Sequence, residues 1–203
     1  MAYYVWLNDD FCEPVNGRMW PNQLDVWTDQ VEPRIHKAGW QVVMGSGVVD
    51  GIPWRHLPAT LYRVEVEEPV DEDGDHTAWS RAMLVERYGR LRPEMARQAA
   101  VAIMTQIVNY YQHPSFYRGP NDLSRLDECA RVIAMGRDFL SNNGESPLKR
   151  AIQSGYAPLI HMARSLEATS DDMAWVHAMF ISPDIKDKAL KLDMARALSE
   201  VLE

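Results

Sequence analysis

The chain has 203 residues, of which 46% are hydrophobic and 25% are charged, a composition typical of a globular protein and not of a disordered one. No apolar run approaches the roughly 18 residues that a membrane-spanning helix needs. The formal net charge of −8 argues against the clustered basic surface that nucleic acid or an anionic membrane requires, so we expect neither as a partner.

The N-terminal part of the chain, residues 1–90, reads as strands and turns. Residues 2–7, AYYVWL, predict a first strand, and residues 40–44 predict a second. Between them, prolines and glycines break residues 12–39 into turns, with one helical turn at 34–37. Six of the seven tryptophans lie before residue 80, where we expect them to anchor the core and turns.

A charged hairpin is the clearest feature of this part. In ATLYRVEVEE, residues 59–68, apolar and charged positions alternate, which predicts a half-buried antiparallel strand. The acidic segment after it predicts a turn, and residues 76–87 predict the returning strand. We expect the following side chains to face the core: Tyr62, Val64, Val66, Trp79, Met83 and Val85.

The rest of the chain, residues 91–203, reads as helices. Pro93 and Glu94 mark the start of a helix that runs to about Tyr111. Further helices are predicted at residues 121–140, 146–155, 157–166, 170–180 and 182–202. Short links between helices favour antiparallel neighbours. We therefore predict an α+β fold: a small antiparallel sheet packed on a C-terminal antiparallel helical bundle, together forming one compact unit.

The cysteines and the N-terminus indicate the compartment. Cys12 and Cys129 are too few for a disulfide framework and too far apart for a metal-knuckle spacing. Cys129 falls on an apolar helical stripe, where a thiol acts as a small core residue. The first residues turn acidic by Asp9 and lack the basic segment of a secretory signal. We expect a cytoplasmic protein.

A pattern of tryptophan, glutamate and proline suggests a relationship. Residues 26–43 read VWTDQVEPRIHKAGWQVV, and LPATLYRVEVEEPV and AWSRAMLVERYG follow. This order resembles an uncharacterised family of small proteins from bacteriophages and actinobacterial genomes, which carries a W-T-x-x-V-E-P-x-L-C-x-x-G-W-H-like element before an L-Y-x-V-E-V strand. The matching residues are Trp27, Thr28, Val31, Glu32, Pro33, Gly39, Trp40 and Tyr62–Val66.

The resemblance implies a phage or prophage context and no particular chemistry. Two positions depart from the family pattern: His36 stands in place of its cysteine, and Gln41 stands in place of its histidine. Those family residues would be natural metal or nucleophile candidates, and this chain has neither in place. For a phage protein, the expected location is the host cytoplasm or the virion.

The charge of the chain is concentrated in the hairpin. Seven acidic residues and no basic ones lie between Glu65 and Asp75, and without them the net charge would be −1. The turn candidates are Asp71, Glu72, Asp73 and Asp75. Such a turn acts as a solvated tip that discourages edge pairing, as a contact surface for a basic partner, or as a site for Ca²⁺ or Mg²⁺, although the EF-hand order is missing.

A second candidate surface is an aromatic loop at the end of the first long helix. Tyrosine and arginine are enriched in binding hot spots, and they cluster here. The residues are Tyr110, Tyr111, His113, Phe116, Tyr117 and Arg118. The alternative is that the aromatic rings pack the two halves of the chain together.

No motif names a reaction, a metal site or a cofactor. The glycine-rich stretch at 45–51 lacks the Lys-Ser or Lys-Thr of a phosphate loop, and no serine lies in a G-x-S-x-G elbow. Among the histidines, none are spaced as zinc ligands on a helix, although His161 and His177 lie on consecutive predicted helices. We therefore expect a non-enzymatic protein that binds a protein partner. The alternative is an enzyme or small-ligand protein with a cleft between the two halves, lined by His36 or His113.

Overall fold

The structure of the protein is a computed structural model that describes residues 2–14, 16–35, 38–73, 75–112, 137, 141 and 188–203. The chain divides into two compact units. The barrel unit comprises Met1–Met95 and Leu202–Glu203, and the helical unit comprises Ala96–Val201. Among the residues described, neither α-helix combines the length and the apolar character that crossing a membrane would require.

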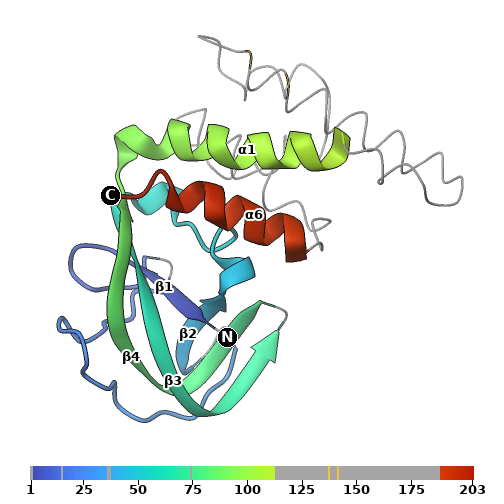
Figure 1. Cartoon of the computed structure of the whole chain (residues 1–203). Helices are drawn as coiled ribbons and strands as arrows, with labels where there is room; N and C mark the ends of the chain where they lie inside the picture. Colours follow the sequence, from blue (N-terminus) through green and yellow to red (C-terminus); the bar gives the residue numbers. More distant parts are fainter. Residues whose placement is uncertain are drawn as a thin grey trace, which may run out of the picture. The chain divides into compact units, whose positions relative to one another are not determined.

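Four antiparallel strands close into a barrel in the order β1-β2-β4-β3. The strands are β1 (Tyr3–Leu7), β2 (Trp40–Met44), β3 (Ala59–Asp73) and β4 (His76–Leu91). β3 and β4 form a long bent hairpin, while β1 and β2 are short (Figure 1). The predicted antiparallel sheet is confirmed, and the two short strands have the predicted positions.

The barrel core is formed by the inner faces of the strands and by the first loop. Tyr62 and Val64 are buried and Val66 packs against them, as the alternation in β3 predicted. Aromatic and β-branched residues dominate because they fill a pleated, buried surface well. The core cluster is Val5, Leu7, Trp20, Trp40, Val42, Tyr62, Val64, Trp79, Ala82 and Leu84.

An irregularity in the hairpin changes which residues of β4 face the core. Val66 pairs with Ala82 and Val70 pairs with Trp79, so three residues of β3 lie opposite two of β4. Such a bulge reverses the inward and outward alternation of the side chains. The prediction that Met83 and Val85 face inward is therefore wrong, because it continued the period of two from Trp79 through the bulge.

The acidic segment is mostly strand. β3 continues to Asp73, and residues 71–73 pair with residues 76–78 of β4. The predicted turn at 69–75 is thus wrong except at its last residues. Pairing with β4, together with the packing of Val70 on the core, outweighs the low strand propensity of aspartate.

The loop before β2 also differs from its prediction. Arg34 and Ala38 exchange two backbone hydrogen bonds, of 3.0 and 2.8 Å, as an antiparallel bridge and not as a helical turn. Gly39 follows with a φ of 85°, and a Cβ there would lie 3.0 Å from Pro33 Cα. Gln41 donates from its amide nitrogen to the carbonyl of Ala38 at 2.8 Å. The residues on either side of positions 36–37 are therefore held together by backbone and side-chain hydrogen bonds.

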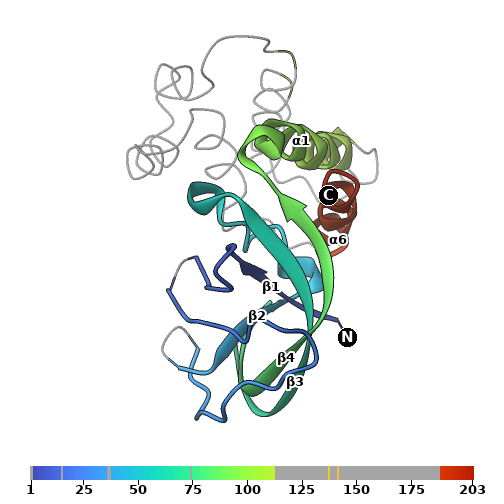
Figure 2. The ribbon, with the colours of Figure 1, turned by 90° about the vertical axis from the view of Figure 1, so that its left-hand side faces the viewer.

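In the helical unit, α1 (Ala96–Gln112) and α6 (Lys188–Ser199) are described, and they pack side by side (Figures 1 and 2). A 3₁₀ turn, η3 (Pro93–Met95), precedes α1 and confirms the predicted helix start. Apolar residues three or four positions apart form the buried face of each helix. These are Ala99, Ile103, Ile107 and Val108 in α1, and Leu190, Met194, Ala197 and Leu198 in α6. The helices predicted between residues 121 and 180 lie outside the described residues, apart from Arg137 and Ser141.

The last two residues of the chain pair with the end of β4. The amide of Arg90 donates to the carbonyl of Glu203 at 2.7 Å, and the amide of Glu203 donates back at 3.2 Å. Arg92 adds an ion pair of 2.6 Å with the Glu203 carboxylate. Leu202 lies so close to Gly89 that a Cβ on the glycine would be 2.6 Å from the leucine Cβ. A side chain at position 89 would therefore displace the pairing segment.

Candidate functional site

Two of the four predicted turn carboxylates are engaged within the barrel unit. Asp71 Oδ2 accepts a hydrogen bond of 2.8 Å from the backbone amide of Ile35. Asp75 is buried, and its Oδ1 accepts a hydrogen bond of 2.8 Å from Ser46 Oγ. These two carboxylates stabilise the loops beside the hairpin, which leaves them less accessible to a partner than a turn in solvent would be.

The other carboxylates of the segment face solvent along β3. Glu72 and Asp73 are exposed, as are Glu65 and Glu68. Within the described part of the chain, no ion pair involves any of these four side chains. In that same part, no three His, Cys, Asp or Glu side chains are placed to hold a metal ion, so the Ca²⁺ or Mg²⁺ alternative gains no support there.

The predicted aromatic loop lies largely outside the described residues. Tyr110 is half-buried in α1. The side chain of Tyr111 and the whole of residues 113–118, with His113, Phe116, Tyr117 and Arg118, are not described. The role predicted for this loop stays a prediction.

The segment of residues 25–31, which sequence reading left as turns, lies along β4. Backbone amides at positions 25, 28 and 31 donate to carbonyl oxygens of β4 at 2.8, 2.9 and 3.0 Å. Between these contacts, Trp27 pairs with Met83 as an antiparallel bridge. The W-T-x-x-V stretch that carries the resemblance thus adds a strand-like segment to the outside of the barrel.

Thr28 attaches this segment to β4 most firmly. It is 2% exposed, and its Oγ1 accepts a hydrogen bond of 2.9 Å from the amide of Ala82. Its own amide donates to the carbonyl of Ala82 at 2.9 Å. Next to it, the carbonyl of Asp29 accepts a hydrogen bond of 2.9 Å from the indole nitrogen of Trp40. The segment is therefore held to both β4 and the core.

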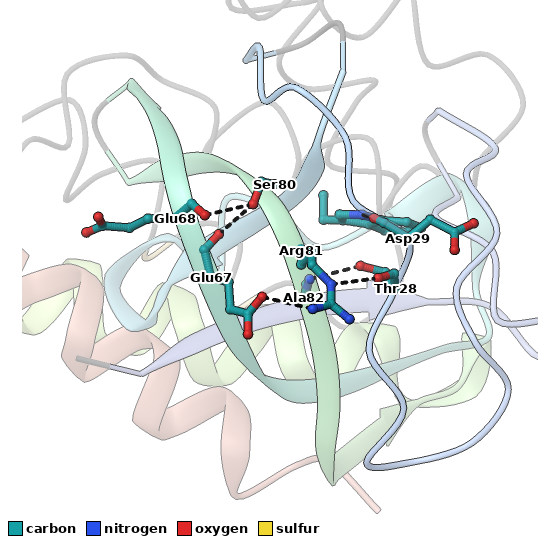
Figure 3. A network of polar contacts seen from close by, with 8 residues as sticks. Thr28, Asp29, Glu67, Glu68, Ser80, Arg81 and Ala82 are labelled. Carbon is teal, nitrogen blue, oxygen red and sulfur yellow. Dashed lines mark hydrogen bonds and ion pairs between the residues drawn. The ribbon is translucent and has the colours of Figure 1, made fainter.

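Arg81 lies between the segment and β3 (Figure 3). Its Nε donates to the carbonyl of Thr28 at 3.2 Å, and its Nη1 donates to Glu67 Oε2 at 3.1 Å. Its guanidinium carbon is 5.2 Å from the ring centroid of Trp27, within the range of a cation–π contact. Glu67 turns toward Arg81, whereas the carboxylate of Glu68 points away from it. The charge of Arg81 is therefore compensated internally, and that of Glu68 is not.

Trp27, Met83 and Glu65 form one row across the outside of the sheet. Glu65 pairs with Met83 in the β3–β4 register, and Met83 pairs with Trp27. Directly paired residues of antiparallel strands point to the same face. Met83 and Trp27 are half-buried, so this row places apolar surface beside carboxylates. We call the following residues the outer face: Trp27, Glu65, Glu67, Arg81 and Met83.

A separate cavity of about 370 Å³ lies between the loop after β1 and the loop before β3. Its lining residues all belong to the barrel unit, so it is not the cleft between halves that the sequence suggested. Cys12, a half-buried free thiol, is one of them, and Asp9 in the lining is paired with Arg90 at 2.8 Å. The lining is Asn8, Asp9, Asp10, Cys12, Glu13, Pro14, Gly17, His56, Leu57 and Pro58.

Glu13 is the most buried carboxylate of the cavity, at 6% exposure. Burial raises the pKa of this carboxyl, and hydrogen bonds from Trp20 and Asn16 and the charge of Arg18 partly offset the rise. The Trp20 indole nitrogen donates to Glu13 Oε1 at 2.7 Å, and Trp20 packs edge-on against Trp40 at 5.0 Å. Glu13 therefore ties the first loop to the core.

Two of the six histidines lie among the described residues. His56 lines the loop cavity, and His76 begins β4. The other four histidines are those on which the predicted histidine sites depend. They lie outside the described residues and are His36, His113, His161 and His177.

Sequence reasoning missed the outer face because three separate segments form it. The sequence carries one weak signal for this face: in the returning strand, Arg81 and Met83 alternate with the smaller residues Ser80 and Ala82. Comparison with known proteins finds no matching family model, no matching curated protein and no matching solved structure.

Proposed function

We propose that this chain is a binding protein that recognises a protein partner through its outer face. The observation that carries the proposal is the row of Glu65, Met83 and Trp27, in which apolar surface lies next to carboxylates without ion-pair partners among the described residues. Protein interfaces are typically an apolar centre with a polar rim, and tryptophan and arginine are enriched at their hot spots.

The rigidity of the outer face supports this role. Arg81 is held by a carbonyl, a carboxylate and an indole ring before any partner arrives. Thr28 fixes the backbone that carries Trp27. Side chains that are already ordered lose less conformational entropy on binding, so more of the contact energy becomes affinity.

A protein partner fits the charge better than nucleic acid does. The exposed carboxylates of β3 would repel phosphates, and the basic side chains near them, Arg63 and Arg81, are paired with Glu86 and Glu67. Phosphate recognition depends on clustered, available cations.

The test is a selection of random peptides by ribosome display on the purified full chain. Counter-selection uses the variant Glu65→Lys, and the matched control carries the same charge change at exposed Glu200. We expect peptides that bind the wild type and the control but not the outer-face variant. Peptides that bind all three proteins equally, or no enrichment, would contradict the proposal.

A second candidate function, small-ligand binding, is supported by the loop cavity. Its volume of about 370 Å³ lies within the range of small-ligand pockets, and its polar groups converge from two loops. A fragment screen by NMR tests it, with backbone shifts at Asn8 and His56 as the readout. A screen in which no fragment shifts those resonances would remove this candidate.

The phage context implied by the resemblance remains part of the proposal. A virion component and a factor directed at a host protein are both binding proteins. The neighbouring genes distinguish them, because capsid and tail genes indicate the former and early anti-host genes indicate the latter.

A further inference from the structure

Resting on that proposed function, we infer that the partner presents an extended segment that carries both lysine or arginine and an apolar side chain. The outer face combines the half-buried apolar side chains of Trp27 and Met83 with negative charge, and each part selects one half of this chemistry.

The available charge is negative because the basic residue of the outer face is already compensated. Arg81 and Glu67 pair at 3.1 Å, and the guanidinium also stacks on Trp27. Glu65 and Glu68 are exposed and have no ion-pair partner among the described residues. A cationic side chain that approaches this face therefore meets the free carboxylate of Glu65 and a cation that Glu67 has neutralised.

The carboxylates are spread along the strand and do not converge on one point. Glu65 and Asp73 are eight positions apart, which corresponds to about 26 Å at roughly 3.3 Å per residue. Convergent ligands would favour a metal ion, whereas a line of charge of this length favours a polybasic segment. Pro69 lies within this line and has no N–H, so a partner would engage side chains here in preference to extending the β-ladder.

Apolar contact comes from the other edge of the outer face. Met83 is half-buried between Glu65 and Trp27, and methionine adapts its shape to a partner. Trp27, which pairs with Met83 and is also half-buried, continues this apolar surface. A purely basic peptide would leave this surface in water, so the best ligand has an apolar residue among its cations.

The experiment uses three synthetic peptides of one length and measures their binding to the full chain by fluorescence anisotropy. The first contains lysines and leucines, the second has serine in place of each leucine, and the third has glutamine in place of each lysine. We expect the lysine–leucine peptide to bind at least about tenfold more tightly than either of the others. Its affinity should fall as salt rises from about 50 to 150 mM.

Protein variants locate the contacts. Glu65→Gln should weaken the lysine–leucine peptide about tenfold, while the same neutralisation at exposed Glu200 should leave its affinity unchanged. Met83→Gln should weaken the lysine–leucine peptide and not the lysine–serine one. Circular dichroism of each variant establishes that the fold is retained.

The outcomes separate this inference from the proposed function. If displayed peptides depend on the outer face but carry no positive charge, the proposed function stands and the inferred chemistry is overturned. Tight binding of the glutamine–leucine peptide, or of a single-stranded DNA probe at this face, would overturn it too. If no ligand depends on the outer face, both fail.

Discussion

The substitution Thr28→Val tests whether one buried hydrogen bond holds the segment of residues 25–31 on β4. Valine has nearly the shape of threonine but no acceptor, so the amide of Ala82 would lose its 2.9 Å partner. An unsatisfied buried amide costs about 1–3 kcal/mol. The added methyl group returns about 0.8 kcal/mol of apolar burial, which leaves a net loss of about 0.2–2 kcal/mol in the free energy of unfolding.

The assay is urea unfolding followed by tryptophan fluorescence, together with amide hydrogen exchange. Six of the seven tryptophans lie in the barrel unit, so the fluorescence reports mainly on that unit. Thr28→Ser is the control, because it keeps the acceptor and loses one methyl group. Both substitutions lower stability, but we expect faster exchange of the Ala82 amide, relative to its neighbours, in the valine variant alone.

Unchanged protection of the Ala82 amide in Thr28→Val would refute the reasoning. So would a valine variant whose midpoint equals that of the wild type. If the reasoning holds, the same variant should also weaken partner binding, because Thr28 fixes the backbone next to Trp27.

Three further predictions concern the first loop, the short 3₁₀ helix η1 (Gly45–Gly47) and the end of the chain. Burial raises the pKa of Glu13, so the stability that its carboxyl contributes is present below the ordinary glutamate pKa and is lost as the pH rises through the raised pKa of the folded state. Glu13→Gln should remove this pH dependence of the free energy of unfolding. Parallel stability–pH curves for the variant and the wild type would count against the prediction. Gly47→Ala would place a Cβ 2.9 Å from the Asp75 Cβ and should lower the free energy of unfolding in urea by about 1–3 kcal/mol. Gly51→Ala is the control and should lower it less, because the nearest atoms to its Cβ would be 3.6 Å away. Equal effects of the two substitutions would rule out the steric explanation. Deleting the last two residues removes two backbone hydrogen bonds to Arg90 and should destabilise the barrel by about 1–3 kcal/mol, and an unaltered fluorescence midpoint would show that this pairing contributes little.

Local patterns predicted the strands well, since their signals are contained within a few residues. β1 and β2 are runs of aromatic and β-branched residues bounded by turn formers, and both were predicted within a residue of their ends. The core side of β3 followed from simple alternation. α1 followed from its proline start and apolar spacing.

Long-range pairing was not predictable in the same way. The bulge opposite Ser80 reverses which residues of β4 face the core. No local sequence signal predicts the position at which three residues of one strand lie opposite two of the other. The outer face depends on the pairing of Trp27 with Met83, which are more than fifty residues apart in the chain. The turn propensities of a loop do not predict which distant strand the loop will pair with. The two candidate surfaces read from the sequence were contiguous stretches, while the surface that the structure supports best is assembled from three segments.

The pairing of Glu203 with Arg90 has a consequence for how the protein is made. The helical unit is inserted between Met95 and Leu202 of the barrel unit, so the barrel is discontinuous in the chain. During synthesis the four strands emerge first, but their last backbone pair cannot form until residue 203 has left the ribosome. Closing so long a loop is entropically costly unless the inserted unit holds its ends together. The backbone pair between Arg90 and Glu203 is therefore expected to form after the four strands and not together with them.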